Sequence, residues 1–300
     1  MRITITEEHT GGRLDKVLQA ILVEKSRSAI QQAIERGLVR VNGKTVKKHH
    51  MVRVGDVIDV EDAPKVVHHE HVAVPDPHIL VEADEYLVLD KPTGMLVHPT
   101  IRNETGTLVD FLLKKYPKIR HIGDDPQRPG IVHRLDKDAS GIMVVPKTQQ
   151  AFDVLKKQFL LREVKKRYKI LVYGAVTPLE GVIQAPLSRS KQNRTRIAAG
   201  SKAGRVAITQ YWVEKQFKGY SLVRVEPQTG RTHQIRVHFL SKGHPVVGDA
   251  LYVSRNVKKT LSVRLMLHAE MLGFKDVSGV YHEYECPPDV DFQGIISKLE

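Results

Sequence analysis

A charged segment enclosed by two apolar runs limits the possible folds of this chain more than any other feature. Ile131 and Val132 precede it, the run 142–145 follows it, and glycines stand at positions 130 and 141. Apolar, largely β-branched runs bounded by glycine are typical of buried strands. The pattern therefore predicts two strands that meet at a charged turn on the edge of a packed sheet.

Asp136 is the candidate functional residue of this turn. It is flanked by Arg134 and Lys137, and a carboxylate near fixed cations stays ionised well below neutral pH. An ionised carboxylate suits a nucleophile or a base and not a proton donor. A structural ion pair or a helix cap is the commoner explanation of one aspartate in a loop. A functional role for Asp136 therefore needs support from other parts of the sequence.

The charge of the chain indicates the class of its partner. Lys and Arg number 47 against 34 Asp and Glu, a formal net charge of +13 over 300 residues. Such an excess favours a polyanion, nucleic acid before a membrane surface, although a soluble basic protein would share it. Cys286 is the single cysteine, which excludes an intrachain disulfide and a cysteine-based zinc site. With no apolar run of membrane-spanning length, we expect a cytoplasmic protein with no membrane partner.

Residues 13 to 60 have the pattern of a compact unit with two helices and a small sheet. Apolar residues recur at helical spacing over 14–22, and Ser28 with Gln31 forms a capping box for a second helix that Gly37 would end. Asn42-Gly43 between alternating apolar residues predicts a hairpin, because both turn positions favour positive φ. The expected strands are 38–41, 45–46 and 57–60.

Basic residues crowd this small unit, which favours phosphate binding over mere solvation. The arrangement Arg13-Leu14-Asp15, Ser26-Arg27, Gly37 and 39–43 resembles the αL RNA-binding motif first known from a small-subunit ribosomal protein. The resemblance implies that Arg13, Ser26, Arg27 and Arg40 bind RNA.

A proline-bearing stretch separates this unit from the remainder of the chain. Residues 63–78 contain three prolines among His68, His69 and His71. These histidines lack further ligands at defined spacing, so a solvated tether is a better interpretation than a metal site. We therefore expect an RNA-binding domain at 1–62, a linker at 63–78 and a catalytic domain at 79–300.

The larger domain combines strands and helices in clusters without regular βαβ alternation. This order predicts an α+β domain with a mixed, mostly antiparallel sheet flanked by helices. The expected strands are 79–81, 86–89, 168–173, 206–213 and 221–225, and the expected helices are 108–116 and 150–164.

A second charged turn lies at residues 228–239. Thr232 can cap a helix that runs to about Ser241 and ends at Gly243, which places Arg231 and the first amides of the helix where an anion could bind. A polar helix with a surface arginine is the plainer alternative. His233 and His238, five positions apart, do not share one face, so they are a poor metal pair.

The charged segments occur in one order with further short motifs over residues 79–300. This series resembles the RluA-type pseudouridine synthases, which convert uridine in RNA to pseudouridine without a metal or another cofactor. An N-terminal αL-motif domain occurs in those members that modify large-subunit ribosomal RNA. The resemblance implies that the RNA partner is large-subunit (23S) ribosomal RNA in preference to transfer RNA. We expect the protein to be a monomer. The motifs are 90–94, 97–99, His133-Arg134-Leu135-Asp136 with Ser140-Gly141, Tyr168, 230–238, Gly248-Asp249 and 265–269.

The resemblance also implies roles for individual residues. Arg134 would fill the place of a uridine that has left its stack, and Asp136 would either attack the ribose or remove a proton from it. Arg231 would form the ion pair that keeps Asp136 ionised, and Tyr168 would stack on the uracil. The sequence departs from the family pattern at two positions, with Ala139 in place of Thr and Val253 in place of Gly after Tyr252. Neither change involves the carboxylate, so we expect them to affect the detailed geometry of the site more than its activity.

Two rival functions share parts of this pattern. A non-catalytic RNA-binding or ribosome-assembly factor would have the same charge and N-terminal unit, but it would not need Asp136, Tyr168 and Arg231 together. A carboxylate-dependent nuclease usually needs paired acidic residues for two metals, and only Asp138 lies near Asp136 in the sequence.

Overall fold

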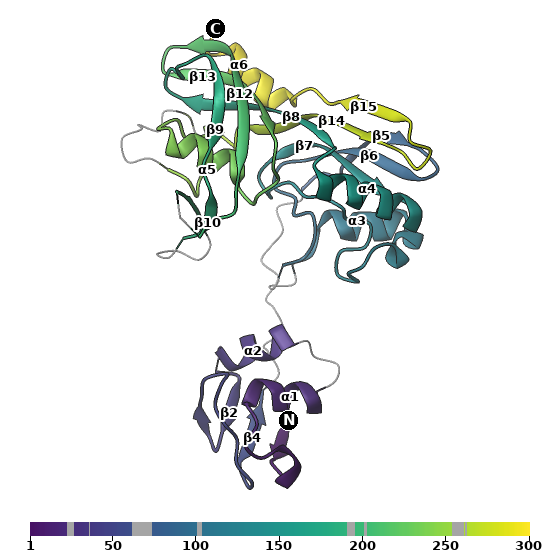
Figure 1. Cartoon of the computed structure of the whole chain (residues 1–300), viewed down its shortest axis with the longest axis vertical. Helices are drawn as coiled ribbons and strands as arrows, with labels where there is room; N and C mark the ends of the chain where they lie inside the picture. The colour runs from purple at the N-terminus through teal and green to yellow at the C-terminus, as the bar shows by residue number, and fades with distance from the viewer. Residues whose placement is uncertain are drawn as a thin grey trace. The chain divides into compact units, whose positions relative to one another are not determined.

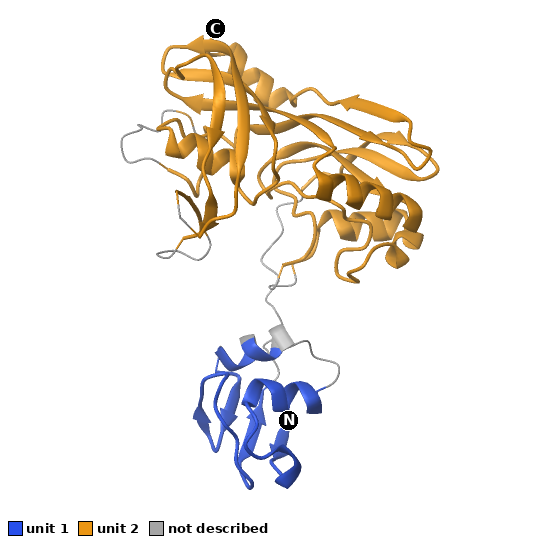
Figure 2. Ribbon diagram, viewed as in Figure 1, with its two compact units in different colours: residues 1–71 blue, residues 72–300 orange. Residues whose placement is uncertain are grey.

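The computed structural model of the chain divides into two compact units, residues 1–71 and 72–300 (Figure 2). It describes residues 1–22, 27–35, 37–61, 74–100, 104–190, 196–200, 203–253, 261 and 263–300, without the side chains of 27–29 and 32. The histidines of the expected linker lie outside the described residues. The division between the units falls inside the stretch 63–78 that we interpreted as a tether.

The first unit packs two helices on one small antiparallel sheet. Asn42 (φ 49°) and Gly43 (φ 75°) both adopt positive φ and confirm the hairpin between β2 and β3. The capping box is wrong, because Ser28 lies inside the second helix. The elements are β1 (Arg2–Thr4), a 3-10 turn (Glu7–His9), α1 (Leu14–Ile21), α2 (Arg27–Glu35), β2 (Val39–Val41), β3 (Lys44–Thr45) and β4 (Val57–Val60), with the strand order β1-β4-β2-β3.

The second unit is built on one long mixed sheet, as the sequence predicted (Figure 1). Its described strands run in the order β5-β6-β7-β14-β8-β13-β12-β9, with β15 also paired to β14, and only β7 and β14 pair in parallel. The strands are β5 (His78–Glu82), β6 (Tyr86–Lys91), β7 (Ser140–Pro146), β8 (Lys165–Tyr173), β9 (Glu180–Gln184), β12 (Ile208–Phe217), β13 (Tyr220–Pro227), β14 (Leu267–Lys275) and β15 (Tyr281–Glu285).

Helices lie beside this sheet, and a separate hairpin forms a second, two-stranded sheet. In Figure 1, α3 and α4 lie beside the half that contains β5, β6 and β7, whereas α5 lies beside the half that contains β9, β12 and β13. Thr107 and Asp110 form a capping box at the start of α3, and Thr148 caps α4. The elements are α3 (Leu108–Lys115), a 3-10 turn (Pro117–His121), α4 (Gln149–Leu161), α5 (Gln234–Ser241), α6 (Val290–Ser297), and the hairpin strands β10 (Leu187–Arg189) and β11 (Ile197–Ala199).

The parallel junction of β7 and β14 sits in the middle of the sheet and receives the charged turn. Gly141 pairs with Ala269 there, and a Cβ at Gly141 would lie 2.3 Å from the carbonyl oxygen of Ala269. Only glycine allows this approach. Residues 142–145 form the predicted buried strand, but Ile131 and Val132 do not form one. They are packed against the core from an irregular segment, which periodicity cannot distinguish from a short strand.

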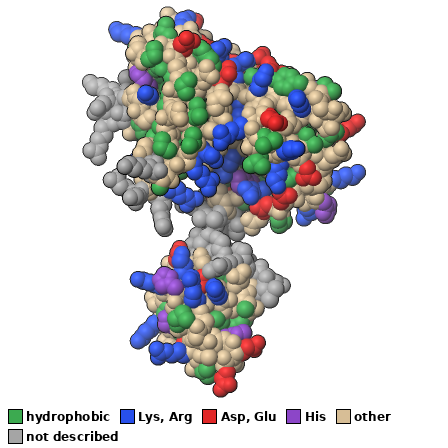
Figure 3. Space-filling model, viewed as in Figure 1, with side chains coloured by type: hydrophobic (Ala, Val, Ile, Leu, Met, Phe, Trp, Pro, Cys, Tyr) green, Lys and Arg blue, Asp and Glu red, His purple; other side chains and the backbone are tan. Residues whose placement is uncertain are grey.

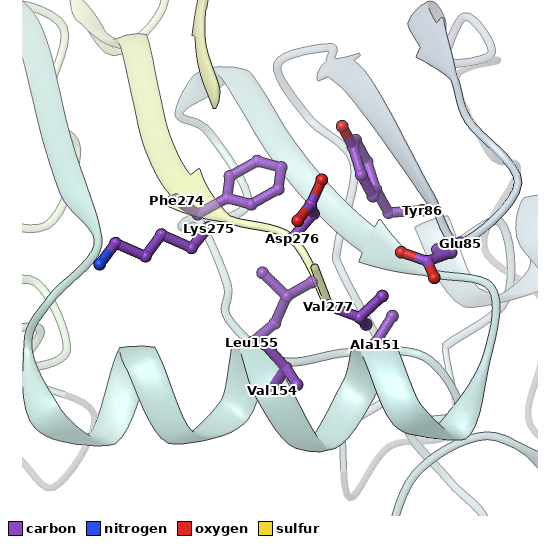
Figure 4. A pocket seen from close by; sticks show the side chains of 9 residues that line it. All are labelled: Glu85, Tyr86, Ala151, Val154, Leu155, Phe274, Lys275, Asp276 and Val277. Carbon is purple, nitrogen blue, oxygen red and sulfur yellow. The ribbon is translucent and has the colours of Figure 1, made fainter. Parts of the chain in front are cut away.

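The hollow between α4 and the end of β14 is filled by packing. Figure 4 shows Ala151, Val154 and Leu155 of α4 facing Phe274 and Tyr86. The rings of Tyr86 and Phe274 meet edge to face at 5.1 Å, a favoured aromatic geometry. The hollow leaves no room for a water molecule, so it is part of the core and not a site. In the described part of the chain, no helix has the length and apolarity that crossing a membrane requires.

Candidate active site

The turn that carries Asp136 is anchored on one side by His133. The imidazole stacks on Phe159 of α4 with 4.5 Å between ring centroids, and its Nε2 accepts a hydrogen bond from the backbone N–H of Val144 at 3.0 Å. Burial lowers the pKa of His133 to about 3, so the ring is neutral and can act as this acceptor. His133 therefore fixes the turn to β7 and α4.

Lys91 anchors the same turn from the other side. Its fully buried ammonium donates to the backbone carbonyls of Pro92, Met95 and Lys137 at 2.8, 2.9 and 3.2 Å. These three bonds use every donor of the group, although burial lowers the pKa of Lys91 to about 7. We had interpreted 90–94 only as one of the short family motifs, with no role for Lys91. A lysine at the end of a strand of apolar residues was the signal that we missed.

Asp136 forms its ion pair with Arg236 and not with Arg231. Nη1 of Arg236 lies 2.8 Å from Oδ2 of Asp136, and the guanidinium also forms a two-point pair with Asp249 at 2.7 and 2.8 Å. The side chains of Asp136, Arg236 and Asp249 are 17, 6 and 0% exposed. One buried guanidinium thus holds two carboxylates, and this contact corrects the expected pair.

The start of α5 explains the correction. The helix begins at Gln234 with His233 as its N-cap residue, later than the Thr232 cap predicted. The Gln234 side chain accepts hydrogen bonds from the Thr229 hydroxyl and from the Arg231 backbone N–H, which ties down the segment before the helix. Arg236 lies in the first turn on the buried face, whereas Arg231 is half-buried and its Nε lies 3.3 Å from the carbonyl oxygen of Val206.

The charges of this cluster support one another. Burial opposes the charge of Arg236, but the hydrogen bonds and the negative charges of Asp249 and Asp136 outweigh it and raise the pKa of the guanidinium. Asp249 is itself held by the backbone N–H groups of Leu251 and Tyr252, each at 2.8 Å. The cation beside Asp136 is therefore permanent and fixed in place.

Tyr168 belongs to the same site. It lies on β8, opposite Ala269 of β14 in the sheet register. Burial raises the pKa of its phenol, and the negative charge of Asp136 raises it further. The structure therefore brings Tyr168 and Asp136 within electrostatic reach, with the phenol protonated at neutral pH.

Arg134 is exposed on the turn that carries Asp136. Its charge acts on two imidazoles, since the pKa values of His98 and His233 are lowered mainly by burial and additionally by Arg134. In Figure 3, Lys and Arg side chains gather in a hollow on the face of the second unit that is in view. Such a surface suits a phosphate backbone.

The expected RNA-binding residues of the first unit have different surroundings. Arg13 forms a two-point ion pair with the buried carboxylate of Asp15, at 3.1 Å for each contact. Arg40 is about half exposed, 3.8 Å from Glu61. Ser26 lies outside the described residues, and Arg27 opens α2 with its side chain not described. Arg13 and Arg40 are thus the members of the set whose side chains are described, and both are about half exposed.

Among the described residues, no group of three or more His, Cys, Asp and Glu side chains could hold a metal ion. His238 of the weak pair points elsewhere, since its Nδ1 lies 2.8 Å from the Thr209 hydroxyl and its Nε2 lies 3.2 Å from the carbonyl oxygen of Ala185. His233 instead lies beside Asp136, with 3.8 Å between Nε2 and Oδ1.

The chain matches known families and proteins over most of its length. Residues 85–241 match the family described as RNA pseudouridylate synthase, and residues 12–58 match the S4 domain. The uncharacterized RNA pseudouridine synthase YlyB of Bacillus subtilis is 37% identical over 99% of this chain and 97% of its own. Ribosomal large subunit pseudouridine synthase D of Pseudomonas aeruginosa is 36% identical over 96% of this chain and 92% of its own.

Solved structures agree with these matches. Human RNA pseudouridylate synthase domain containing 1 superposes with a TM-score of 0.61 and 26% identity, over 73% of this chain and 86% of that one. The family pattern spans the strands and helices that hold Asp136, Tyr168 and Arg236. Full-length relatives, matched fold and matched site region together show that this chain belongs to the RNA pseudouridylate synthase family, as an enzyme with an N-terminal S4 domain.

Proposed function

We propose that this enzyme converts uridines of large-subunit ribosomal RNA to pseudouridine and that Asp136 carries the chemistry. The observation that supports the role of Asp136 most directly is its contact with the buried Arg236, 2.8 Å away, beside Tyr168. Relatives that are named ribosomal large subunit pseudouridine synthase D, such as that of Pseudomonas aeruginosa, support the choice of RNA. A substrate of this kind implies work in the cytoplasm.

The reaction breaks the bond between the ribose and the uracil nitrogen and rejoins the base through its carbon five. The carbon-five proton is released and the nitrogen gains one, so no group donor or redox change is needed. Asp136 would act on the ribose either as a nucleophile at the anomeric carbon or as a base at the neighbouring carbon. Both routes need an ionised carboxylate in a partly closed site, and Arg236 supplies the compensating charge.

The other residues of the site have complementary roles in this proposal. Tyr168 offers a planar apolar face to the uracil and a hydroxyl for proton movement at carbon five. Arg134 reaches outward from the same turn to occupy the place of the extruded base. The ion-pair role that we expected for Arg231 passes to Arg236, and Arg231 keeps a half-buried guanidinium whose charge suits a phosphate.

The test is release of tritium from RNA labelled at carbon five of uridine, with and without a chelator. Release that is insensitive to the chelator supports the proposal. Strand scission would indicate a nuclease, and absence of both would indicate a binding factor. A nuclease is disfavoured in advance, because the guanidinium of Arg236 occupies the space between the two carboxylates where metal ions would have to bind.

The matched variants are Asp136→Asn and Asp138→Asn. The first removes the ionisable group and keeps the shape of the side chain, so we expect no turnover and nearly unchanged RNA binding. The second changes an exposed carboxylate two positions away and should leave the rate close to wild type. Multiple turnover by Asp136→Asn would remove this residue from its central role.

A further inference from the structure

Tyr252 joins three parts of the second unit at the active site. Its hydroxyl accepts a hydrogen bond from the backbone N–H of Ile197 in β11 at 2.8 Å and lies 2.8 Å from Nδ1 of His233. Its ring faces the guanidinium of Arg236, with 5.0 Å to the ring centroid. The side chain is buried within a small core beneath the β10–β11 hairpin. Tyr252 therefore contacts the hairpin, the start of α5 and the arginine that holds Asp136.

His233 has a left-handed backbone conformation, which few residues other than glycine adopt. Its φ is 55° and its ψ is 20°. As the N-cap residue of α5, it makes no side-chain cap hydrogen bond. Its side chain instead points to Asp136 and Tyr252. A strained backbone whose side chain serves no local structure suggests a function for that side chain.

The hydrogen bonds around Tyr252 favour one tautomer of His233. The Tyr252 oxygen accepts the N–H of Ile197, and its own proton can be donated to Nδ1 of His233. In that arrangement the imidazole proton is on Nε2, which faces Oδ1 of Asp136 at 3.8 Å. Burial lowers the pKa of His233, which agrees with a neutral ring that carries one proton.

The two oxygens of Asp136 are consequently different. Oδ2 is fixed by Arg236 at 2.8 Å. Oδ1 makes no hydrogen bond to any other described residue, and the Nε2–H of His233 stands just beyond hydrogen-bond reach of it. An oxygen without a bound donor is the more reactive of the pair, provided that something limits its rotation.

We propose that Oδ1 of Asp136 is the reacting oxygen and that His233, oriented by Tyr252, is a positioning residue that keeps it aimed at the ribose. The inference rests on the proposed role of Asp136 and adds two residues to it. Tyr252 also bonds to Ile197 of the β10–β11 hairpin. The same side chain therefore contacts the hairpin and orients the histidine beside the carboxylate. Neither residue forms or breaks a bond in this scheme.

The experiment compares two amide substitutions at His233. In His233→Gln the amide nitrogen reaches the place of Nε2, whereas in His233→Asn it reaches only the place of Nδ1. With the tritium-release assay we expect His233→Gln to keep kcat within about threefold, and His233→Asn to lose about 10- to 100-fold, the range for misplacement of a reacting group. KM for RNA should stay within about twofold in both variants, because the substitutions change the orientation of the Asp136 carboxylate and not the binding of RNA.

Tyr252→Phe tests the other half of the support. It keeps the ring under Arg236 and removes the hydroxyl, so kcat should fall about tenfold or more with KM unchanged. Tyr211→Phe is the matched control, because it removes a buried hydroxyl whose hydrogen bond within the described part of the chain is a long one, 3.4 Å to the Pro178 carbonyl. That control should retain wild-type kinetics. Thermal melting of each variant distinguishes a misoriented carboxylate, which leaves the melting temperature unchanged, from a loss of folded structure, which lowers it.

Several results would overturn the inference. Equal kcat in His233→Asn and His233→Gln would do so, as would wild-type kcat in Tyr252→Phe. Should His233→Asn melt below the assay temperature, the tyrosine pair decides alone. Activity in Asp136→Asn would instead defeat the proposed function itself, whatever the His233 variants do, so the two failures are distinguishable.

Discussion

At the scale of single residues, the site is a compensated cluster of buried charge. The Asp136 and Asp249 carboxylates flank one guanidinium, and the side chain of Asp249 is fully buried. Removing one member of such a cluster leaves an unpaired charge out of water, which is far more damaging than loss of an exposed pair. The two arginines of the second charged turn should therefore behave very differently when substituted.

Arg236→Met should lower the free energy of unfolding by about 3 to 5 kcal/mol, the usual range when a buried pair is broken, and should abolish turnover. Arg231→Met is the matched control, because Arg231 is half-buried with one long contact to a carbonyl. We expect a change within about 0.5 kcal/mol for it. Urea denaturation of both variants provides the measurement, and a larger loss in Arg231→Met would contradict the assignment of the ion pair.

His133 should make the fold sensitive to acid. Its pKa is lowered by burial to about 3 in the folded protein, against about 6.5 for an unperturbed histidine. Between these values the unfolded chain binds the proton more strongly, so stability is present above about pH 6.5 and is lost as the pH falls, by at most about 1.4 kcal/mol per pH unit for this one group.

Denaturation curves between pH 7 and pH 5 measure this slope. His133→Gln should flatten it relative to wild type, whereas substitution of the exposed His121 to Gln should not. Identical slopes in wild type and His133→Gln would show that the imidazole is not held neutral in the fold.

At the scale of elements, the contact of β7 with β14 places the turn that carries Asp136. The two strands are the parallel pair of the described sheet, and Gly141 stands where their backbones come closest. The turn from Leu135 to Ala139 enters β7 immediately before this point, and both end residues are buried. The position of Asp136 thus depends on a backbone approach that a side chain would block.

Gly141→Ala should destabilise the enzyme by several kcal/mol, because its Cβ would lie 2.3 Å from the Ala269 carbonyl oxygen, in addition to about 1 to 2 kcal/mol of backbone strain at positive φ. Gly219→Ala carries the strain alone, since its φ is 84° and no atom lies within 4 Å of the added Cβ. Thermal melting should give a clearly lower melting temperature for Gly141→Ala than for Gly219→Ala. Equal losses would mean that the strands can move apart.

At the scale of the whole molecule, the enzyme joins a catalytic unit to a separate S4 unit with its own core. Phosphate contacts by such a unit would add sequence-independent affinity that weakens with salt. The chemistry would stay in the second unit, so binding and turnover should respond to different substitutions.

Substitution of Arg27 and Arg40 to Gln should raise KM for RNA, reduce the salt dependence of binding by about one unit of slope per lost phosphate contact, and leave kcat unchanged. Lys215→Gln removes a similar charge from β12 of the second unit, where Lys215 pairs with Glu300, and serves as control. Affinity measured at several salt concentrations tests this. An unchanged slope would count against the S4 unit as an RNA anchor.

Local patterns determined much of this protein in advance. The Asn42-Gly43 hairpin, the strand that follows Gly141 and the helices α3 and α4 arise from short-range preferences, so the sequence sufficed to predict them and the α+β class. The short motifs around Asp136 and Tyr168 likewise needed no structure to be noticed.

Only the tertiary structure decided which residues support Asp136. Arg236 and Asp136 are 100 positions apart, and which arginine of 231–236 meets the carboxylate depends on where α5 begins and which face it buries. The anchoring by Lys91 and the contacts of Tyr252 with His233 and Arg236 likewise join distant segments. Spacing along a chain records local periodicity, whereas the partner of a buried charge is chosen by the packing that excludes water from it.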